Sequence, residues 1–201
     1  MRRSKPYHKA DLRRVLIDAA RDHIAAHGHL SLSLRALAAQ AGVTTAAPYH
    51  HFADRRALLL AVAEEAYATL LTQSQAVTAS ALPPAEKLMV LGMNFLRFAE
   101  AQPRLMELMF ESELTTPVID PALSALQTQA YAAQIAVIAQ ALPHISSLEV
   151  SVRAMALWSL IYGYATLRAK LSMRPYDPTD VPTDQVDRAV LDRAVIAALA
   201  P

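Results

Sequence analysis

The amino-acid sequence predicts an all-α protein with an N-terminal head of three helices and a C-terminal helical bundle. Apolar residues recur every three or four positions along most of the chain, and no useful stretch alternates as a half-buried strand would. The 12 prolines outnumber the 4 glycines, which is typical of helices that end at prolines. We expect about nine helices, with the head at 9–69 and the bundle at 70–201; 201 residues suffice for one or two small domains.

The composition argues against several classes of protein. No apolar run of about 18 residues lacks charges, so we expect no transmembrane segment and no membrane partner. The first residues, Met-Arg-Arg-Ser-Lys, do not read as a secretory signal, and the absence of cysteine fits a reducing cytoplasm. No glycine-rich phosphate loop, G-x-S-x-G or H-E-x-x-H motif occurs. We therefore expect no enzyme and assign neither catalytic residues nor a cofactor.

Charge is distributed unevenly between the two parts. Residues 1–56 contain ten Lys or Arg and four Asp, a net charge of +6, whereas the remainder carries −5. A basic head on an acidic body is typical of a protein that binds a polyanion. The alternative is an ordinary mixed surface. Within this basic part, residues 1–9 are either an arm that reaches phosphates or a disordered terminus.

The first helix is expected at 10–27, ending at Gly28. Its apolar stripe consists of Leu12, Val15, Leu16, Ala19, Ala20 and Ile24. Three histidines, His23, His27 and His29, lie close together at its end. No carboxylate or cysteine completes a metal site at a familiar spacing, so we assign no metal and interpret them as solvated histidines near a helix C-terminus.

Residues 33–52 have the pattern of a helix, a tight turn and a second helix. Ser33 is a good N-cap, and Gly42 allows the chain to turn after the first helix. Thr44 or Thr45 is expected to cap the second helix, which tolerates Pro48 because its missing N–H falls near the first turn. This pattern is typical of a helix-turn-helix, whose second helix enters the DNA major groove.

Residues 32–59 also resemble the DNA-binding signature of the TetR family of bacterial transcription regulators. The matching residues are Ala41-Gly42-Val43, Thr44, Tyr49-His50-His51-Phe52, Arg55 or Arg56, and Leu58. Pro48 departs from the Leu or Ile of many members, as does the run Thr45-Ala46-Ala47. The resemblance implies a ligand-responsive regulator, more often a repressor, that binds a palindromic operator as a homodimer and is released by a small apolar effector. Half-sites would lie about 34–36 Å apart or at multiples of that distance.

The expected DNA contacts are of two kinds. Contacts to phosphates fix the register of the protein on DNA, and contacts to bases read the sequence. We assign these contacts to Ser33, Arg35, Thr44, Thr45, Ala46, Tyr49, His50, Arg55 and Arg56. Only Thr44, Thr45 and His50 offer base-directed donors or acceptors. We therefore expect apolar and indirect readout, with His51 and Phe52 facing the core.

The remaining helices are expected at 55–80, capped by Asp54, and at 84–101, 103–112, 119–142, 147–173 and 184–199. In the family, the helix after the helix-turn-helix joins head to body. Trp158 to Gly163 resembles, over a short stretch, a TetR C-terminal domain named for Trp-His-Gly, with Tyr162 in place of the His. The resemblance places the homodimer contact on 147–173 and 184–199, which are rich in alanine. Those alanines could instead pack within one subunit.

A ligand pocket is suggested by the many Met and aromatic residues of the body. The candidates are Met89, Met93, Phe95, Met106, Met109, Phe110, Tyr131, Trp158 and Tyr162, with Arg97, Glu111, Glu113 and Arg153 at the mouth. The alternative is that these side chains form an ordinary core. A DNA-binding protein without any effector is the main functional alternative.

Overall fold

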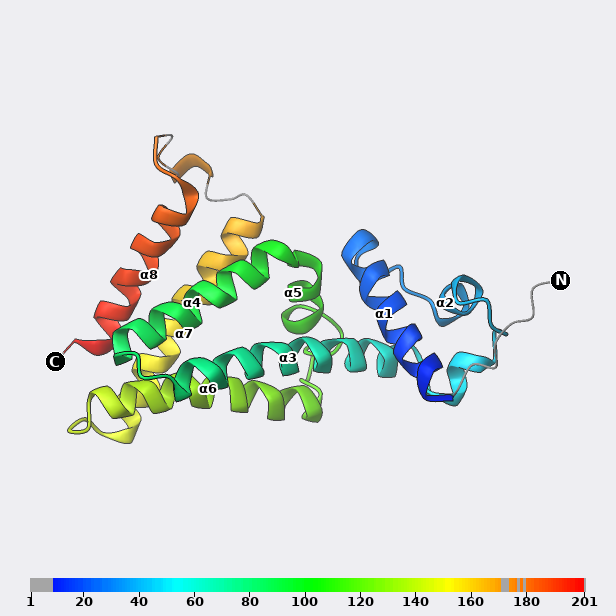
Figure 1. Ribbon diagram of the computed structural model, residues 1–201, viewed down its shortest axis with the longest axis horizontal. Coiled ribbons are helices and arrows are strands. Elements are labelled where there is room, and N and C mark those ends of the chain that lie inside the picture. The colour runs from blue at the N-terminus through cyan, green and yellow to red at the C-terminus, as the bar shows by residue number, and fades with distance from the viewer. Residues whose placement is uncertain (1–8, 171–173, 177, 179, 201) are drawn as a thin grey trace. The chain divides into compact units, whose positions relative to one another are not determined.

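The computed structural model describes residues 9–170, 174–176, 178 and 180–200. Within these residues every regular element is a helix (Figure 1). The α-helices are α1 (Lys9–His27), α2 (Leu34–Gln40), α3 (Arg55–Ala79), α4 (Pro84–Ala101), α5 (Pro103–Phe110), α6 (Pro121–Ala141), α7 (Ser147–Ala169) and α8 (Thr183–Leu199), with 3-10 helices η1 (Ala47–His50) and η2 (Arg174–Tyr176). The prediction of an all-α fold is confirmed.

Most predicted helix boundaries agree with the structure to within two residues. The helix predicted at 84–101 has those bounds, and Asp54 caps α3 by accepting a hydrogen bond from the Ala57 N–H at 2.8 Å. The helix predicted at 147–173 ends at Ala169, and residues 171–173 lie outside the described residues. The described chain has eight α-helices and two 3-10 helices, in agreement with the expected total of about nine helices. The second helix of the helix-turn-helix is a single 3-10 turn.

The chain divides into two compact units that do not follow a single cut in the sequence. Unit 1 comprises the described residues up to Ala66 together with Arg104–Ser124, and unit 2 comprises Tyr67–Pro103 and the described residues from Ala125 onward. The three boundaries therefore fall inside α3, after the first residue of α5, and inside α6. The segment 104–124, which the sequence placed with the body, clusters with the head.

The core of unit 1 is formed by α1, α2, the first part of α3, and α5. Fully buried side chains come from α1, α2, α3, α5, the segment after α5 and the start of α6: Leu16, Ile24, Leu37, Leu58, Leu59, Leu108, Met109, Leu114 and Leu123. Phe52, which follows η1, is 3% exposed and lies beneath the Arg13 guanidinium, 5.5 Å from the ring centre. Burial of each of these side chains contributes about 1.5–3 kcal/mol to the free energy of unfolding of the head.

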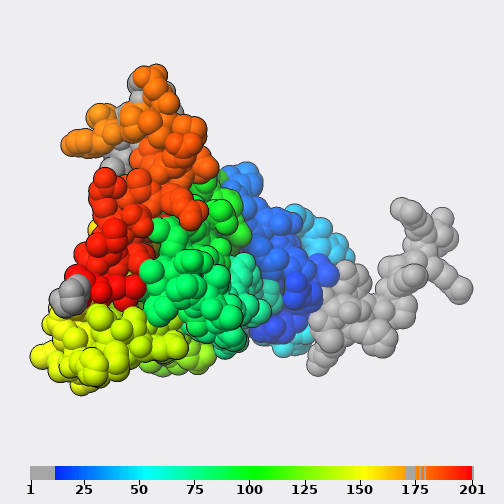
Figure 2. Space-filling view, turned by 60° about the vertical axis from the view of Figure 1, so that its left-hand side comes forward, coloured from blue at the N-terminus to red at the C-terminus, as the bar shows by residue number. Residues whose placement is uncertain are grey.

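In unit 2, helices α4, α7 and α8 pack on one another in pairs, and Figure 2 shows α8 against α4. Gly92 allows the close approach of these two helices, because a Cβ there would lie 3.1 Å from Leu191 Cδ1. Neighbouring core side chains on α4 and α7 include Leu88, Leu91, Phe95, Leu157 and Ile161. The apolar faces of α4 and α7 thus meet.

Two buried charged groups in unit 2 have partners that explain their burial. Lys87 is 7% exposed and donates from Nζ to the Thr78 carbonyl at 2.8 Å, near the C-terminus of α3, where the helix dipole favours a cation. Asp187 is 8% exposed; it accepts a hydrogen bond from the Tyr164 hydroxyl at 2.7 Å and pairs with Arg168 at 2.8 Å. This second cluster ties α7 to α8.

None of the helices, over the residues that the structure describes, combines the length and the apolarity needed to cross a lipid bilayer.

Candidate nucleic-acid interface

The first half of the helix-turn-helix is built as the sequence predicts. Ser33 has extended backbone angles, and its Oγ accepts a hydrogen bond from the Ala36 N–H at 3.2 Å. Leu34 and Leu37 are buried beneath α2, and Gly42 has a φ of +68°, a conformation that glycine adopts without a Cβ penalty. These features fix where α2 begins and how the chain leaves it.

The second half differs from the prediction of a capped helix. The N-cap of η1 is Ala46, which makes no side-chain cap bond, so the expected capping by Thr44 or Thr45 was wrong. The Thr44 carbonyl accepts from the Ala47 N–H at 3.0 Å, three residues on. An α-helix would require a bond to that carbonyl from residue 48, and Pro48 has no N–H. Pro48 itself is buried.

Seven of the nine predicted DNA-contact residues present exposed side chains in unit 1. They are Ser33, Arg35, Thr44, Thr45, Ala46, Tyr49 and His50, and Tyr49 is 56% exposed although it is a large aromatic residue. Phe52 is in the core, as expected, whereas His51 is half-buried. The exposed groups therefore lie on α2, the turn and η1. Whether they touch DNA stays a prediction.

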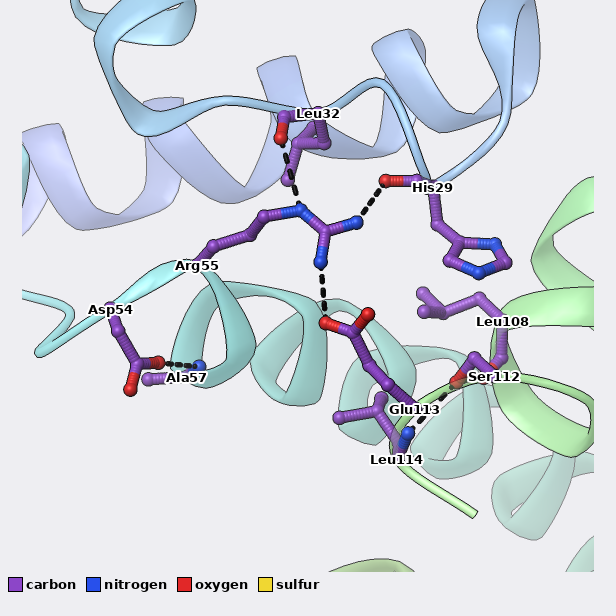
Figure 3. A network of polar contacts seen from close by, with 9 residues as sticks. All are labelled: His29, Leu32, Asp54, Arg55, Ala57, Leu108, Ser112, Glu113 and Leu114. Carbon is purple, nitrogen blue, oxygen red and sulfur yellow. Dashed lines mark hydrogen bonds and ion pairs between the residues drawn. The ribbon is translucent and has the colours of Figure 1, made fainter. Parts of the chain in front are cut away.

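Arg55 is the hub of a hydrogen-bond network at the base of the head (Figure 3). Its Nε donates to the Leu32 carbonyl at 3.0 Å, its Nη2 donates to the His29 carbonyl at 2.5 Å, and its Nη1 pairs with the Glu113 carboxylate. The side chain is 29% exposed. Arg55 thus links the α1–α2 turn to the start of α3 and to the segment after α5, which makes it the least available of the predicted phosphate contacts.

Arg56 has a different environment from its neighbour. Its Nη1 pairs with Asp120 Oδ2 at 2.5 Å, and its side chain is 42% exposed. Asp120 is 12% exposed, and its Oδ1 also accepts from the Ala122 N–H at 3.0 Å at the start of α6. The hydrogen bond from Arg56 lowers the pKa of Asp120, assisted by the Ala122 N–H and against the opposing effect of burial.

The three histidines at the end of α1 lie in three different environments. His27 is exposed, whereas His29 is 4% exposed, so the interpretation of all three as solvated was wrong for His29. His29 points toward Leu108 and Ser112 (Figure 3), and its Nδ1 has no hydrogen-bond partner among the residues that the structure describes. His23 Nε2 lies 3.0 Å from Ser31 Oγ, and burial, followed by the charge of His27, lowers the pKa of His23. Over the described residues, no three His, Cys, Asp or Glu side chains are placed to hold a metal ion.

The predicted pocket residues do not all belong to one unit. In unit 2, Trp158 lies 4.7 Å from Phe95, 5.3 Å from Tyr131 and 6.0 Å from Tyr162 between ring centres. Three of these rings, those of Tyr131, Trp158 and Tyr162, are half-buried, and burial raises the pKa of Tyr131 although a hydrogen bond with Trp158 opposes the rise.

The other predicted pocket residues lie elsewhere. Met93 is half-buried on α4, and Met89 lines a separate groove of about 780 Å³ between α4 and α8. Met106, Met109 and Phe110 belong to unit 1, where the two methionines are at most 5% exposed. Of the proposed mouth residues, Glu113 pairs with Arg55 in unit 1, and Arg153 pairs with Glu149 at 2.7 Å; Arg97 and Glu111 are exposed.

The outer face of α7 and α8 is unusually apolar for a surface. Leu148, Val152, Met155, Leu160 and Leu167 on α7 are between 40% and 73% exposed. The same face has a hollow of about 180 Å³ between the two helices, whose lining includes Ala156, Ala194, Ala197 and Ala198. Val152 and Leu160 also line this hollow. Exposed apolar surface gathered in this way is typical of an interaction site.

Family models match most of the chain. Residues 16–62 match the model of bacterial regulatory proteins of the tetR family, and residues 88–192 match that of the tetracyclin repressor-like C-terminal domain. The second match covers the stretch from Trp158 to Gly163 but does not test its Trp-His-Gly resemblance. No curated protein matches the sequence.

Solved structures with the same fold cover nearly the whole chain. A protein of unknown function from Rhodococcus sp. RHA1 is 29% identical, with a TM-score of 0.80 over 96% of this chain and 97% of that one. PfmR, a TetR family transcriptional regulator from Thermus thermophilus, is 18% identical (TM-score 0.64, 90% and 96% covered). A TetR family transcription regulator from Marinobacter aquaeolei VT8 is 17% identical (TM-score 0.67, 92% and 94% covered). The last two similarities concern the fold alone.

Proposed function

Because the chain belongs to the TetR family of bacterial transcription regulators, we propose that it is a ligand-responsive repressor. It binds a palindromic operator as a homodimer in the bacterial cytoplasm, and a small apolar effector releases it. The observation that carries the proposal is the set of exposed polar and aromatic side chains on α2, the turn and η1, held on a well-packed head. Regulators of this family are generally not enzymes, and this fits the absence of catalytic motifs from the sequence.

The short helix η1, which is expected to contact the bases, supports recognition by DNA shape and apolar contact more than by hydrogen bonds to guanine. η1 spans only four residues, and Pro48 within it is buried. The exposed groups nearest to it are Thr45, Ala46, Tyr49 and His50, none of which forms the bidentate contact that arginine makes with guanine. Ala46 can contact a thymine methyl. Arg35, exposed on α2, supplies charge for phosphate.

A homodimer through α7 and α8 is supported by the apolar face that these helices present. In a two-fold symmetric contact the same patch faces itself, so side chains such as Met155 of one copy meet the equivalent surface of the other. The hollow floored by Ala156, Ala194 and Ala197 can receive a large side chain from the second copy. The alternative that the alanines pack only within one subunit applies to Ala194 and Ala198, which are buried, but not to Ala156 and Ala197, which are exposed.

The aromatic cluster around Trp158 in unit 2 is the best-supported effector site. Tyr131 and Tyr162 combine half-buried rings with hydroxyl groups, which suits a largely apolar ligand that needs a few hydrogen bonds. An effector would release DNA by favouring one spacing of the two heads over another. Trp158 is the only tryptophan of the chain, so its fluorescence reports directly on occupation of this site.

A reporter gene behind the DNA upstream of this protein's own gene tests the proposal. A repressor lowers expression in a manner that depends on Arg35 and Tyr49, and an effector restores it. A protein that binds DNA without an effector would repress equally in the presence of every compound and would show no thermal shift across an apolar compound library. An increase in expression would identify an activator instead.

A further inference from the structure

The segment that clusters with the basic head is itself acidic. Residues 104–124 contain one arginine, Arg104, and four carboxylates, Glu107, Glu111, Glu113 and Asp120, a net charge of −3. Two of these carboxylates pair with the two consecutive arginines at the start of α3. Unit 1 therefore contains the arginines predicted to contact DNA phosphates, and two of these arginines already pair with carboxylates of the same unit.

The two arginines differ in how firmly they are held. Arg55 has three partners, two of which are backbone carbonyls that no side-chain movement can remove. Arg56, among the described residues, has a single partner, Asp120, and its side chain is more exposed, at 42% against 29%. The arginine end of this part-buried pair is open to solvent, where water and salt screen its charge and weaken the attraction.

Asp120, in contrast, is fixed in place. It is 12% exposed, its Oδ1 accepts from the Ala122 N–H, and its backbone N–H donates to the Leu114 carbonyl at 2.7 Å. If Arg56 leaves, the carboxylate keeps its bond to the start of α6. The arginine is thus the mobile member of the pair, and it can exchange a carboxylate for another anion without dismantling the head.

We propose that Arg56 alternates between two anionic partners, Asp120 in the free protein and a DNA phosphate in the complex, while Arg55 remains a fixed part of the framework. The proposal rests on the proposed DNA-binding function. Asp120 acts as an intramolecular competitor that lowers DNA affinity and is not itself in contact with DNA. The head thus contains, in Asp120, a counter-ion for Arg56, one of the side chains proposed to contact phosphate.

The test is a double-mutant cycle with Asp120→Asn and Arg56→Gln, read as binding to one fixed duplex over a series of salt concentrations. Asparagine retains the capping of α6, because Asn and Asp are equally good N-caps. Asp120→Asn is expected to tighten binding roughly 1.5- to 5-fold, the range of an ion pair that solvent screens from one side. Arg56→Gln is expected to weaken binding and to reduce the slope of log K against log salt by about 0.9, the value for one lost phosphate contact.

The decisive comparison is the double variant. The gain from Asp120→Asn should vanish when Arg56→Gln is already present, because there is then no arginine to release. A matched control is Glu107→Gln, which removes one exposed negative charge from the same segment without touching Arg56, and which should give little gain.

Three results overturn the proposal. These are an unchanged salt slope in Arg56→Gln, a gain from Asp120→Asn that persists in the Arg56→Gln background, and an equal gain in Glu107→Gln. The last two would reveal a general effect of charge. Failure of the unsubstituted protein to bind any duplex would instead refute the DNA-binding function on which the proposal rests.

Discussion

Arg55 donates a hydrogen bond from Nη2 to the carbonyl oxygen of His29, which lies 26 residues earlier in the chain, at 2.5 Å. With the Leu32 carbonyl and Glu113, this contact holds the α1–α2 turn against the first turn of α3 (Figure 3). The turn leads directly into Ser33, the cap of α2. The orientation of the first helix of the helix-turn-helix therefore depends on an arginine outside it.

Replacing Arg55 by Gln should destabilise the head by about 1–3 kcal/mol, because two backbone carbonyls and one carboxylate lose their donor. Denaturant unfolding measures this loss. Arg35→Gln is the matched control: Arg35 is exposed on α2, so its substitution should change stability by at most about 0.5 kcal/mol while weakening DNA binding. Equal stability of the two variants would show that the Arg55 network contributes nothing.

Loss of a side-chain cap should destabilise the first helix of the helix-turn-helix but not the second. Ser33→Ala removes the acceptor of the Ala36 N–H and should cost about 0.5–2 kcal/mol. Thr44→Ala and Thr45→Ala should leave unfolding nearly unchanged, because η1 has no side-chain cap. A loss of stability in either threonine variant as large as in Ser33→Ala would contradict the structure of η1.

The sequence was sufficient to predict those features that depend on neighbouring residues. Ser33, Gly42 and Asp54 are local signals, and each lies where the backbone needs it. The sequence did not predict that η1 would be a short 3-10 helix. The missing N–H of Pro48 is the cause, but its effect depends on which carbonyl that N–H would have met in an α-helix.

Contacts between distant residues could not be predicted in the same way. Asp120 followed by Pro121 is a helix-start signal, yet nothing in the sequence connects it with Arg56, 64 positions earlier. The burial of His29 likewise depends on the α5 segment, about 80 residues later in the chain. The division of the candidate pocket residues could not be predicted for the same reason, since composition does not say that Met106 and Trp158 belong to different units.

Acid should remove the contribution of the Arg56–Asp120 pair to stability. The pKa of Asp120 is lowered in the folded protein, so the unfolded chain takes up a proton at higher pH than the native one does. The contribution is present above the unfolded-state pKa and is lost as the pH falls through the folded-state pKa. Because Arg56 is 42% exposed, screening keeps the effect to about 1 kcal/mol or less.

Unfolding of the unsubstituted protein and of Asp120→Asn at a series of pH values measures this effect. The stability difference should be largest near neutral pH and should disappear at acid pH. A difference that stays constant across the series would show that the charge of Asp120 contributes nothing to stability.

Placing a charge on the apolar face of α7 should separate the homodimer. Met155 is 67% exposed in the single chain, so Met155→Arg should leave the monomer folded while burying an unpaired charge in the symmetric contact. We expect a loss of about 2–5 kcal/mol of dimerisation free energy, visible as a monomer by light scattering. Arg97→Glu, on the exposed side of α4, is the control and should remain dimeric. A dimeric Met155→Arg would place the interface elsewhere.

The central claim is that the head recognises an operator, and binding to the DNA upstream of this protein's own gene tests it most directly. The comparison is with a shuffled duplex of the same composition, at two salt concentrations. The account predicts preferential binding to the upstream DNA that weakens as salt rises and is lost when Arg35→Ala and Tyr49→Ala are combined. Equal affinity for both duplexes, unaffected by the two substitutions, would contradict it.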